Sequence, residues 1–139
     1  MAAPAHVDPP GLSVRLRPGT GDPVLVAVGD LDQDTGPILG SALERLLAAV
    51  PEPGELLLDM SGVRFCDSGG LNALLRARLR VEAAGGVLHM LAPTARMAAL
   101  FSRTGVDRVL RISPAATPSR MALFRATEPA PEPEPADAQ

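Results

Sequence analysis

The sequence has no lysine, tryptophan or tyrosine, and it has a single cysteine and three phenylalanines. A lone Cys66 excludes an intramolecular disulfide and a zinc site built from cysteine pairs. A chain without lysine cannot carry the lysine of a nucleotide-hydrolysing phosphate loop. Three phenylalanines make no base-stacking platform, and a net charge of −3 does not attract polyanions. Binding to nucleic acid is therefore not expected, and the core must consist mainly of Leu, Val and Ala.

Long apolar runs are also missing, since none approaches the roughly 20 residues of a membrane span. The first 11 residues lack the basic opening and apolar centre of a signal peptide, so we expect a cytoplasmic protein without a membrane span. A chain of 139 residues fits one domain. Pro-rich composition predicts a flexible tail at 1–11 and a disordered Pro/Glu/Ala-rich tail at 127–139, which leaves a domain at 12–126.

Between these tails the hydrophobic pattern changes repeatedly between strand and helix periods. Leu12, Val14 and Leu16 alternate with polar residues, which predicts a strand with one wet face. The run VLVAV at 24–28 is apolar throughout, which indicates a strand covered on both sides. The same reasoning predicts further strands within 55–60, 85–93 and 108–112, helices near 34–50, from Gly70 to 83 and at 94–105, and a final helical turn or two at 118–126.

This alternation of strands and helices predicts an α/β fold with a mainly parallel sheet and an antiparallel first strand. Ligands and partners of such sheets usually meet the loops beyond the carboxyl ends of the strands. The segment VRFCDSGGLNALL, at 63–75, lies in one of these loops.

The chemistry of this loop argues against an enzyme. The letters CDSGG do not form a nucleophile elbow, and neither His6 in the tail nor His89 in an apolar strand is placed as a general base. Asp67 raises the pKa of its neighbour Cys66, so we expect that thiol to pack rather than react. Asp67 and Ser68 suit a helix cap, but a helix start also tolerates a phosphate or an acidic partner, and local chemistry does not separate the two.

Four segments together resemble the STAS domain, the family of anti-sigma factor antagonists. They are GDLD at 29–32, LLLDMSGVRFCDSGGLNALLRAR at 56–78, GGVLHMLAP at 85–93 and LFSRTGVDRVLRI at 100–112. The resemblance implies a mixed, mainly parallel sheet of four to five strands with helices packed on one side. It also implies partner switching: the antagonist binds an anti-sigma factor that is a serine kinase, and so releases a sigma factor. Phosphorylation by the kinase ends the binding and a serine phosphatase restores it, with no metal or cofactor in the antagonist.

The family's phosphoacceptor is the third residue of the pattern Asp-Ser-Ser/Thr-Gly-Leu, and here that residue is Gly69. Two versions follow: either Ser68 is a substitute acceptor, or the protein is an antagonist without this regulation. A phosphate beside Asp67 would repel an acidic or packed partner, while the helix dipole would tolerate it in the free protein. The resemblance gives the following partner-binding candidates: Asp30, Asp32, Asp67, Ser68, Gly69, Gly70 and Leu71.

Two other functions remain open from the sequence. A STAS domain without the usual acceptor also fits a signalling scaffold or a subunit of a lipid-transport complex. A sensor of small anions could use Arg76 and Arg80 with the helix start, although arginines at this spacing are typical of a solvated helix face.

Overall fold

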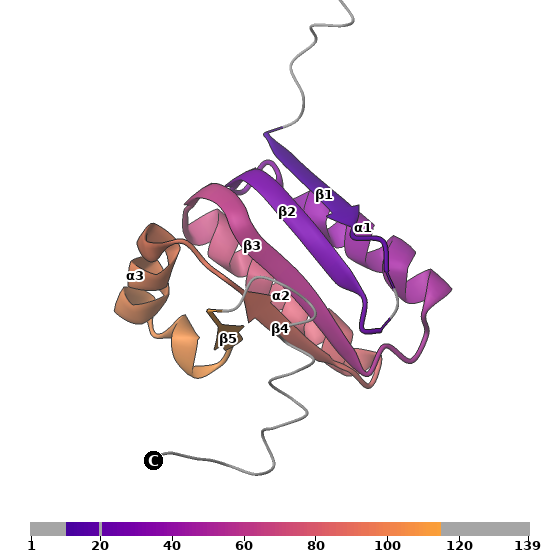
Figure 1. The fold of residues 1–139 in the computed structure, drawn as a ribbon. Coiled ribbons are helices and arrows are strands. Elements are labelled where there is room, and N and C mark those ends of the chain that lie inside the picture. Colours follow the sequence, from indigo (N-terminus) through magenta and orange to yellow (C-terminus); the bar gives the residue numbers. More distant parts are fainter. Residues whose placement is uncertain (1–10, 20, 115–139) are drawn as a thin grey trace, which may run out of the picture.

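Two neighbouring strands near the start of the chain form the antiparallel side of a five-stranded sheet. The computed structural model describes residues 11–19 and 21–114. In it, β1 (Leu12–Leu16) pairs antiparallel with β2 (Val24–Leu31). The strands β3 (Glu55–Cys66), β4 (Val87–Leu91) and β5 (Arg111–Ser113) then add in parallel, in the order β1-β2-β3-β4-β5 (Figure 1). The predicted mixed, mainly parallel sheet is confirmed.

Three α-helices connect these strands. The helices α1 (Gly36–Ala49) and α2 (Ser68–Ala83) lie behind the sheet in Figure 1, and α3 (Ala95–Thr104) follows β4. Their apolar faces join the helix-side residues of the sheet in one core cluster. As expected, the Thr94 hydroxyl caps α3 by accepting a hydrogen bond from the Met97 amide at 3.2 Å, and Gly105 ends it in the left-handed region with φ 81°.

The central strands extend further than the sequence predicted. The third strand was expected to end at Met60, yet β3 continues to Cys66, and β2 continues to Leu31. The two strands pair in parallel almost throughout, with register shifts after Val26 and after Gly29. Because backbone amides and carbonyls inside the protein need hydrogen-bond partners, pairing with β2 keeps Ser61 and Gly62 in the strand. The register shift at this point is an irregularity within β3 and not its end.

Three finer expectations were wrong. Leu16 was expected to face the core but is 54% exposed, because it lies at the end of the edge strand; Val28, on a strand expected to be covered on both sides, is 48% exposed. The last strand is shorter than expected and begins only at Arg111, because 106–108 form a 3₁₀ turn in which the Val109 amide bonds to the Val106 carbonyl at 3.0 Å. The helical turn expected at 118–126 and both tails lie outside the described residues.

Candidate functional site

The carboxyl ends of β2 and β3 bring two loops into contact. Leu31 and Cys66 are register partners at these ends, and the Asp67 amide donates a hydrogen bond to the Leu31 carbonyl at 3.4 Å. We call residues 30–35 and 67–71 together the paired loops. All seven partner-binding candidates from the sequence lie in them, but they do not share one surface: Ser68 is exposed, whereas Gly70 and Leu71 are buried and Leu71 belongs to the core.

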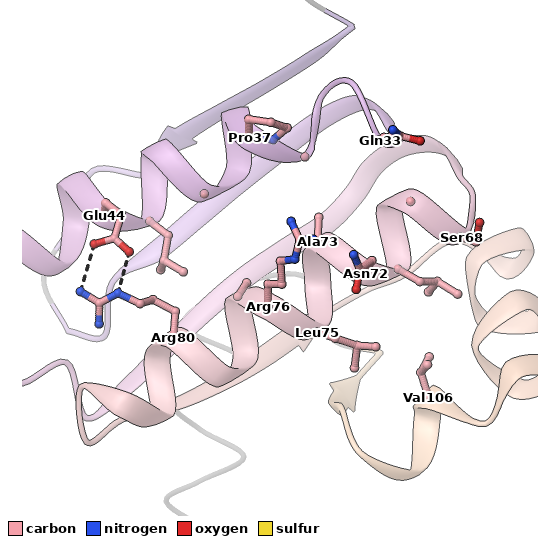
Figure 2. A pocket seen from close by; sticks show the side chains of 16 residues that line it. Gln33, Pro37, Glu44, Ser68, Asn72, Ala73, Leu75, Arg76, Arg80 and Val106 are labelled. Atoms are coloured by element: carbon pink, nitrogen blue, oxygen red, sulfur yellow. Dashed lines mark hydrogen bonds and ion pairs between the residues drawn. The ribbon is translucent and has the colours of Figure 1, made fainter.

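Asp67 caps α2. Its backbone is extended (φ −116°, ψ −167°), and its Oδ1 accepts a hydrogen bond from the Gly70 amide at 2.9 Å. The Leu71 amide donates to the Asp67 carbonyl at 2.8 Å, which closes the first helical turn. The helix therefore begins at Ser68, two residues before the expected start at Gly70. Ser68 is the first helical residue, and its side chain is exposed at the end of the helix (Figure 2).

In the other loop, Asp32 organises the turn that leads into α1. Its Oδ1 accepts hydrogen bonds from the Asp34 amide at 2.9 Å and from the Thr35 amide at 3.0 Å. The buried Thr35 hydroxyl donates to the Asp30 carbonyl at 2.9 Å and accepts from the Asp32 amide at 2.9 Å. Sequence reasoning missed Thr35, although the spacing Asp-x-Asp-Thr is a signal for side chain to backbone turns.

Asp30 has a different neighbour, because its carboxylate forms an ion pair with Arg64 at 3.4 Å. Both side chains are well exposed, so the pair contributes little to stability. Within the described residues, neither Asp30 nor Asp32 bonds through its side chain to the Asp67 loop. Asp32 thus caps the turn that precedes α1, one of the two roles that the sequence had left open, while Asp30 remains at the rim of the paired loops.

Close packing explains why residue 69 is glycine. A Cβ atom on Gly69 would lie 2.7 Å from the Gln33 amide nitrogen and 2.9 Å from the Gln33 Cα and Cβ. Real Cβ atoms essentially never approach other atoms so closely, and here the obstacle is backbone, which cannot rotate away. Any side chain at the family's acceptor position would therefore require the β2–α1 loop or the first turn of α2 to move.

Gly70 is even more confined. Its Cβ would lie 2.2 Å from the Leu31 carbonyl oxygen and 2.8 Å from Cys66 Sγ. The two glycines together allow the β2–α1 loop to lie directly on the start of α2. The two segments of the paired loops therefore pack tightly against each other.

Cys66 lies beneath the paired loops and is half-buried against the core. Burial, with a smaller contribution from the Asp67 carboxylate, raises the pKa of its thiol to about 11. Its Sγ lies 3.6 Å from the Asp67 carbonyl, to which the thiol donates. Cys66 is therefore a packing residue, as the sequence indicated.

A groove of about 1010 Å³ runs between α1 and α2, starting at the paired loops (Figure 2). At its far end Arg80 donates two hydrogen bonds to the Glu44 carboxylate, from Nε to Oε2 at 2.6 Å and from Nη2 to Oε1 at 3.0 Å. This contact lowers the pKa of Glu44 and raises that of Arg80. Because Arg80 is held by a carboxylate of the same chain, an anion site built on Arg76 and Arg80 together is not preformed.

Other kinds of site find no support in the described part of the chain. No group of three or more His, Cys, Asp or Glu side chains there is arranged to hold a metal ion. None of the described helices has the length and apolar character needed to cross a membrane. The paired loops and the adjoining groove are thus the strongest candidate surface.

Comparison with known proteins agrees with this architecture. A family model described as "Mlab, STAS domain" matches residues 14–112. An anti-sigma factor antagonist from Mycobacterium paratuberculosis is 23% identical, with a TM-score of 0.66 over 82% of this chain and 94% of that one. The phosphorylated form of the Bacillus cell fate determinant SpoIIAA is 19% identical, with a TM-score of 0.56 over 82% and 99%. The murine anion transporter Slc26a9 is 16% identical, with a TM-score of 0.63 over 90% of this chain but only 24% of that chain.

No curated protein matches the sequence. At these identities the solved structures establish a shared fold, which occurs both in small antagonists and in part of a much larger transporter. The family model covers most of the chain and nearly all of the sheet. The chain therefore belongs to the STAS domain family.

Proposed function

We propose that the protein is an anti-sigma factor antagonist that works by binding rather than by catalysis. It would bind a kinase-type anti-sigma factor in the cytoplasm through the paired loops, and so release a sigma factor. The observation that supports the proposal is the contact between the loops that follow β2 and β3, which brings the exposed Ser68 and the partly exposed Asp30, Asp32 and Asp67 to one edge of the sheet. Several proteins of similar fold are named as anti-sigma factor antagonists, which supports this reading over the transporter.

Regulation by the family's usual route is not expected, because residue 69 is glycine and carries no hydroxyl, and a Cβ atom there would lie too close to Gln33. Ser68 is the remaining acceptor in this loop, and it is exposed at the positive end of the α2 dipole. A phosphate there would add about −1.5 to −2 charges beside the Asp67 carboxylate. We favour an antagonist that is permanently competent to bind, with Ser68 as the alternative target of the kinase and of a phosphatase.

Intact mass measurement after incubation with the cognate kinase and ATP distinguishes the two versions. No added mass supports the permanently competent antagonist. One added phosphate that disappears in Ser68→Ala establishes Ser68 as the acceptor. Ser102→Ala is a matched control, since Ser102 is also exposed but belongs to α3 and not to the paired loops.

Binding itself is tested by titrating the full chain against purified anti-sigma factors of the source organism. We expect one of them to bind the wild type and Ser68→Ala, and to bind Ser68→Asp about tenfold or more weakly, because the new carboxylate lies within the surface beside Asp67. Ser102→Asp adds the same charge elsewhere and should bind as the wild type does. Equal affinities for Ser68→Asp and Ser102→Asp would exclude the paired loops as the contact surface.

A second candidate is a subunit of a lipid-transport complex or a signalling scaffold that uses the same surface without phosphorylation. The absent acceptor at Gly69 favours it, because such a role needs no phosphorylation. Affinity purification of the full chain at native abundance separates the candidates. A transporter ATPase or permease as the stoichiometric partner supports the second, and an anti-sigma factor supports the first.

A further inference from the structure

The groove between α1 and α2 continues directly from the paired loops. Ser68 and Gly69 line its beginning, and the Glu44–Arg80 ion pair closes its other end (Figure 2). Its walls are largely apolar or small and include Pro37 and Ala73. A partner that covers the paired loops therefore lies next to the start of this groove.

Gly40 has no structural explanation within the described part of the chain. It lies in the middle of α1, where glycine lowers helix stability relative to alanine, and its φ is not positive. Gly36 differs, since its Cβ would lie only 3.1 Å from the Ala73 Cβ, so packing accounts for it. At Gly40 a Cβ would meet nothing within 4 Å. The missing side chain leaves a gap in the wall of the groove through which another backbone can approach.

Arg76 gives the groove its only uncompensated charge among the described residues that line it. Arg80 is neutralised by Glu44, whereas Arg76 forms no ion pair with any described residue. It is exposed, and its guanidinium rises from α2 towards α1 over the groove (Figure 2). A complementary occupant would carry a carboxylate at this point.

We propose that the groove holds an amphipathic helix of the anti-sigma factor, which packs its apolar face against Gly40 and pairs a carboxylate with Arg76. An amphipathic helix suits a groove between two helices, because apolar anchors fill the cleft while charges at its rim fix the register. The inference rests on the proposed function and extends the contact surface from the paired loops along α1 and α2.

The test uses the full chain and the anti-sigma factor that binds in the titration described above. Gly40→Ala should raise the melting temperature, because alanine is the better helix former and meets no atoms, yet weaken binding about tenfold, because the added methyl group blocks the approach. Ser41→Ala is the matched control on α1 and should leave affinity unchanged. A variant that is more stable but binds less tightly cannot owe its weaker binding to damage of the fold.

Charge is tested separately. Arg76→Glu should weaken binding about tenfold or more, and Arg103→Glu, on exposed α3 surface, should not. Reversal of one carboxylate in the partner helix to arginine should restore the affinity of Arg76→Glu. Wild-type affinity in both Gly40→Ala and Arg76→Glu, with Ser68→Asp still impaired, overturns the groove and leaves the proposed function standing.

Other occupants give distinct results, each of which overturns the inference. A dimer of the free protein that Gly40→Ala dissociates indicates a second copy in the groove. A rise in melting temperature with small phosphorylated or carboxylated compounds that disappears in Arg76→Glu, without an effect on partner affinity, indicates an anion site. Failure of every anti-sigma factor to bind the wild type overturns both the groove and the proposed function.

Discussion

The most informative single change is Gly69→Ala, which adds one methyl group at the position where the family carries its acceptor hydroxyl. The added Cβ would lie 2.7 Å from the Gln33 nitrogen, which is roughly 0.7 Å short of an ordinary contact. Because the obstacle is backbone, either the β2–α1 loop or the first turn of α2 must move. Overpacking of this kind costs about 1–3 kcal/mol, and the better helix propensity of alanine returns at most about 1 kcal/mol.

We therefore expect a net loss of between about 0 and 3 kcal/mol in the free energy of unfolding, with a fall in melting temperature of about 4–8 °C for each kcal/mol lost in a domain of this size. Calorimetry of the full chain measures it, with Gly40→Ala as the matched control. Gly40 is also a helical glycine, but a methyl group there meets nothing, so this variant should gain about 0.5–1 kcal/mol. If Gly69→Ala is more stable than the wild type to the same extent as Gly40→Ala, the paired loops do not pack tightly at this position and the explanation for the missing hydroxyl is wrong.

Three further substitutions or measurements test separate features. Asp67→Ala removes the α2 cap and should cost about 1 kcal/mol by chemical denaturation, whereas Asp67→Asn, which can still accept the Gly70 bond, should cost less; equal losses would contradict the capping role. Asp59→Ala removes a buried carboxylate (3% exposed) that pairs with the partly exposed Arg17 and accepts from the Ser61 hydroxyl at 2.7 Å, and should cost about 2 kcal/mol; an unchanged stability would contradict this account. The pKa of about 11 keeps Cys66 protonated, so its alkylation at pH 8 should be about a hundredfold slower than that of a free thiol and should rise up to pH 11; a rate that levels off near pH 9 would refute the shift.

The sequence was sufficient to predict the order of the strands and helices, the antiparallel first strand and the caps of α3. These features depend on local patterns: period-two and period-3.6 apolar spacing, a threonine before a helix and a glycine after one. It also identified Asp67 and Ser68 as residues of a helix start, which the hydrogen bond from Gly70 to Asp67 bears out.

Features that depend on contacts between distant segments could not be predicted. The end of β3 was placed too early because Ser61 and Gly62 resemble a turn, and only pairing with β2 keeps these residues in the sheet. The sequence showed that residue 69 is glycine and that the acceptor hydroxyl is missing. It could not show that the backbone of Gln33, in a different loop, leaves no room for a side chain at this position. Leu16 follows a strand pattern that carries no information about where the edge of the sheet is.

The measurement that tests the central claim most directly is calorimetric titration of the full chain against the purified anti-sigma factors of its source organism, with sigma factor release as a second readout. We predict that one anti-sigma factor binds and releases its sigma factor, that Ser68→Asp weakens the binding about tenfold or more, and that Ser102→Asp leaves it unchanged. Failure of every anti-sigma factor to bind would contradict the proposed function, and equal binding by the two variants would contradict the assignment of the paired loops as the contact surface.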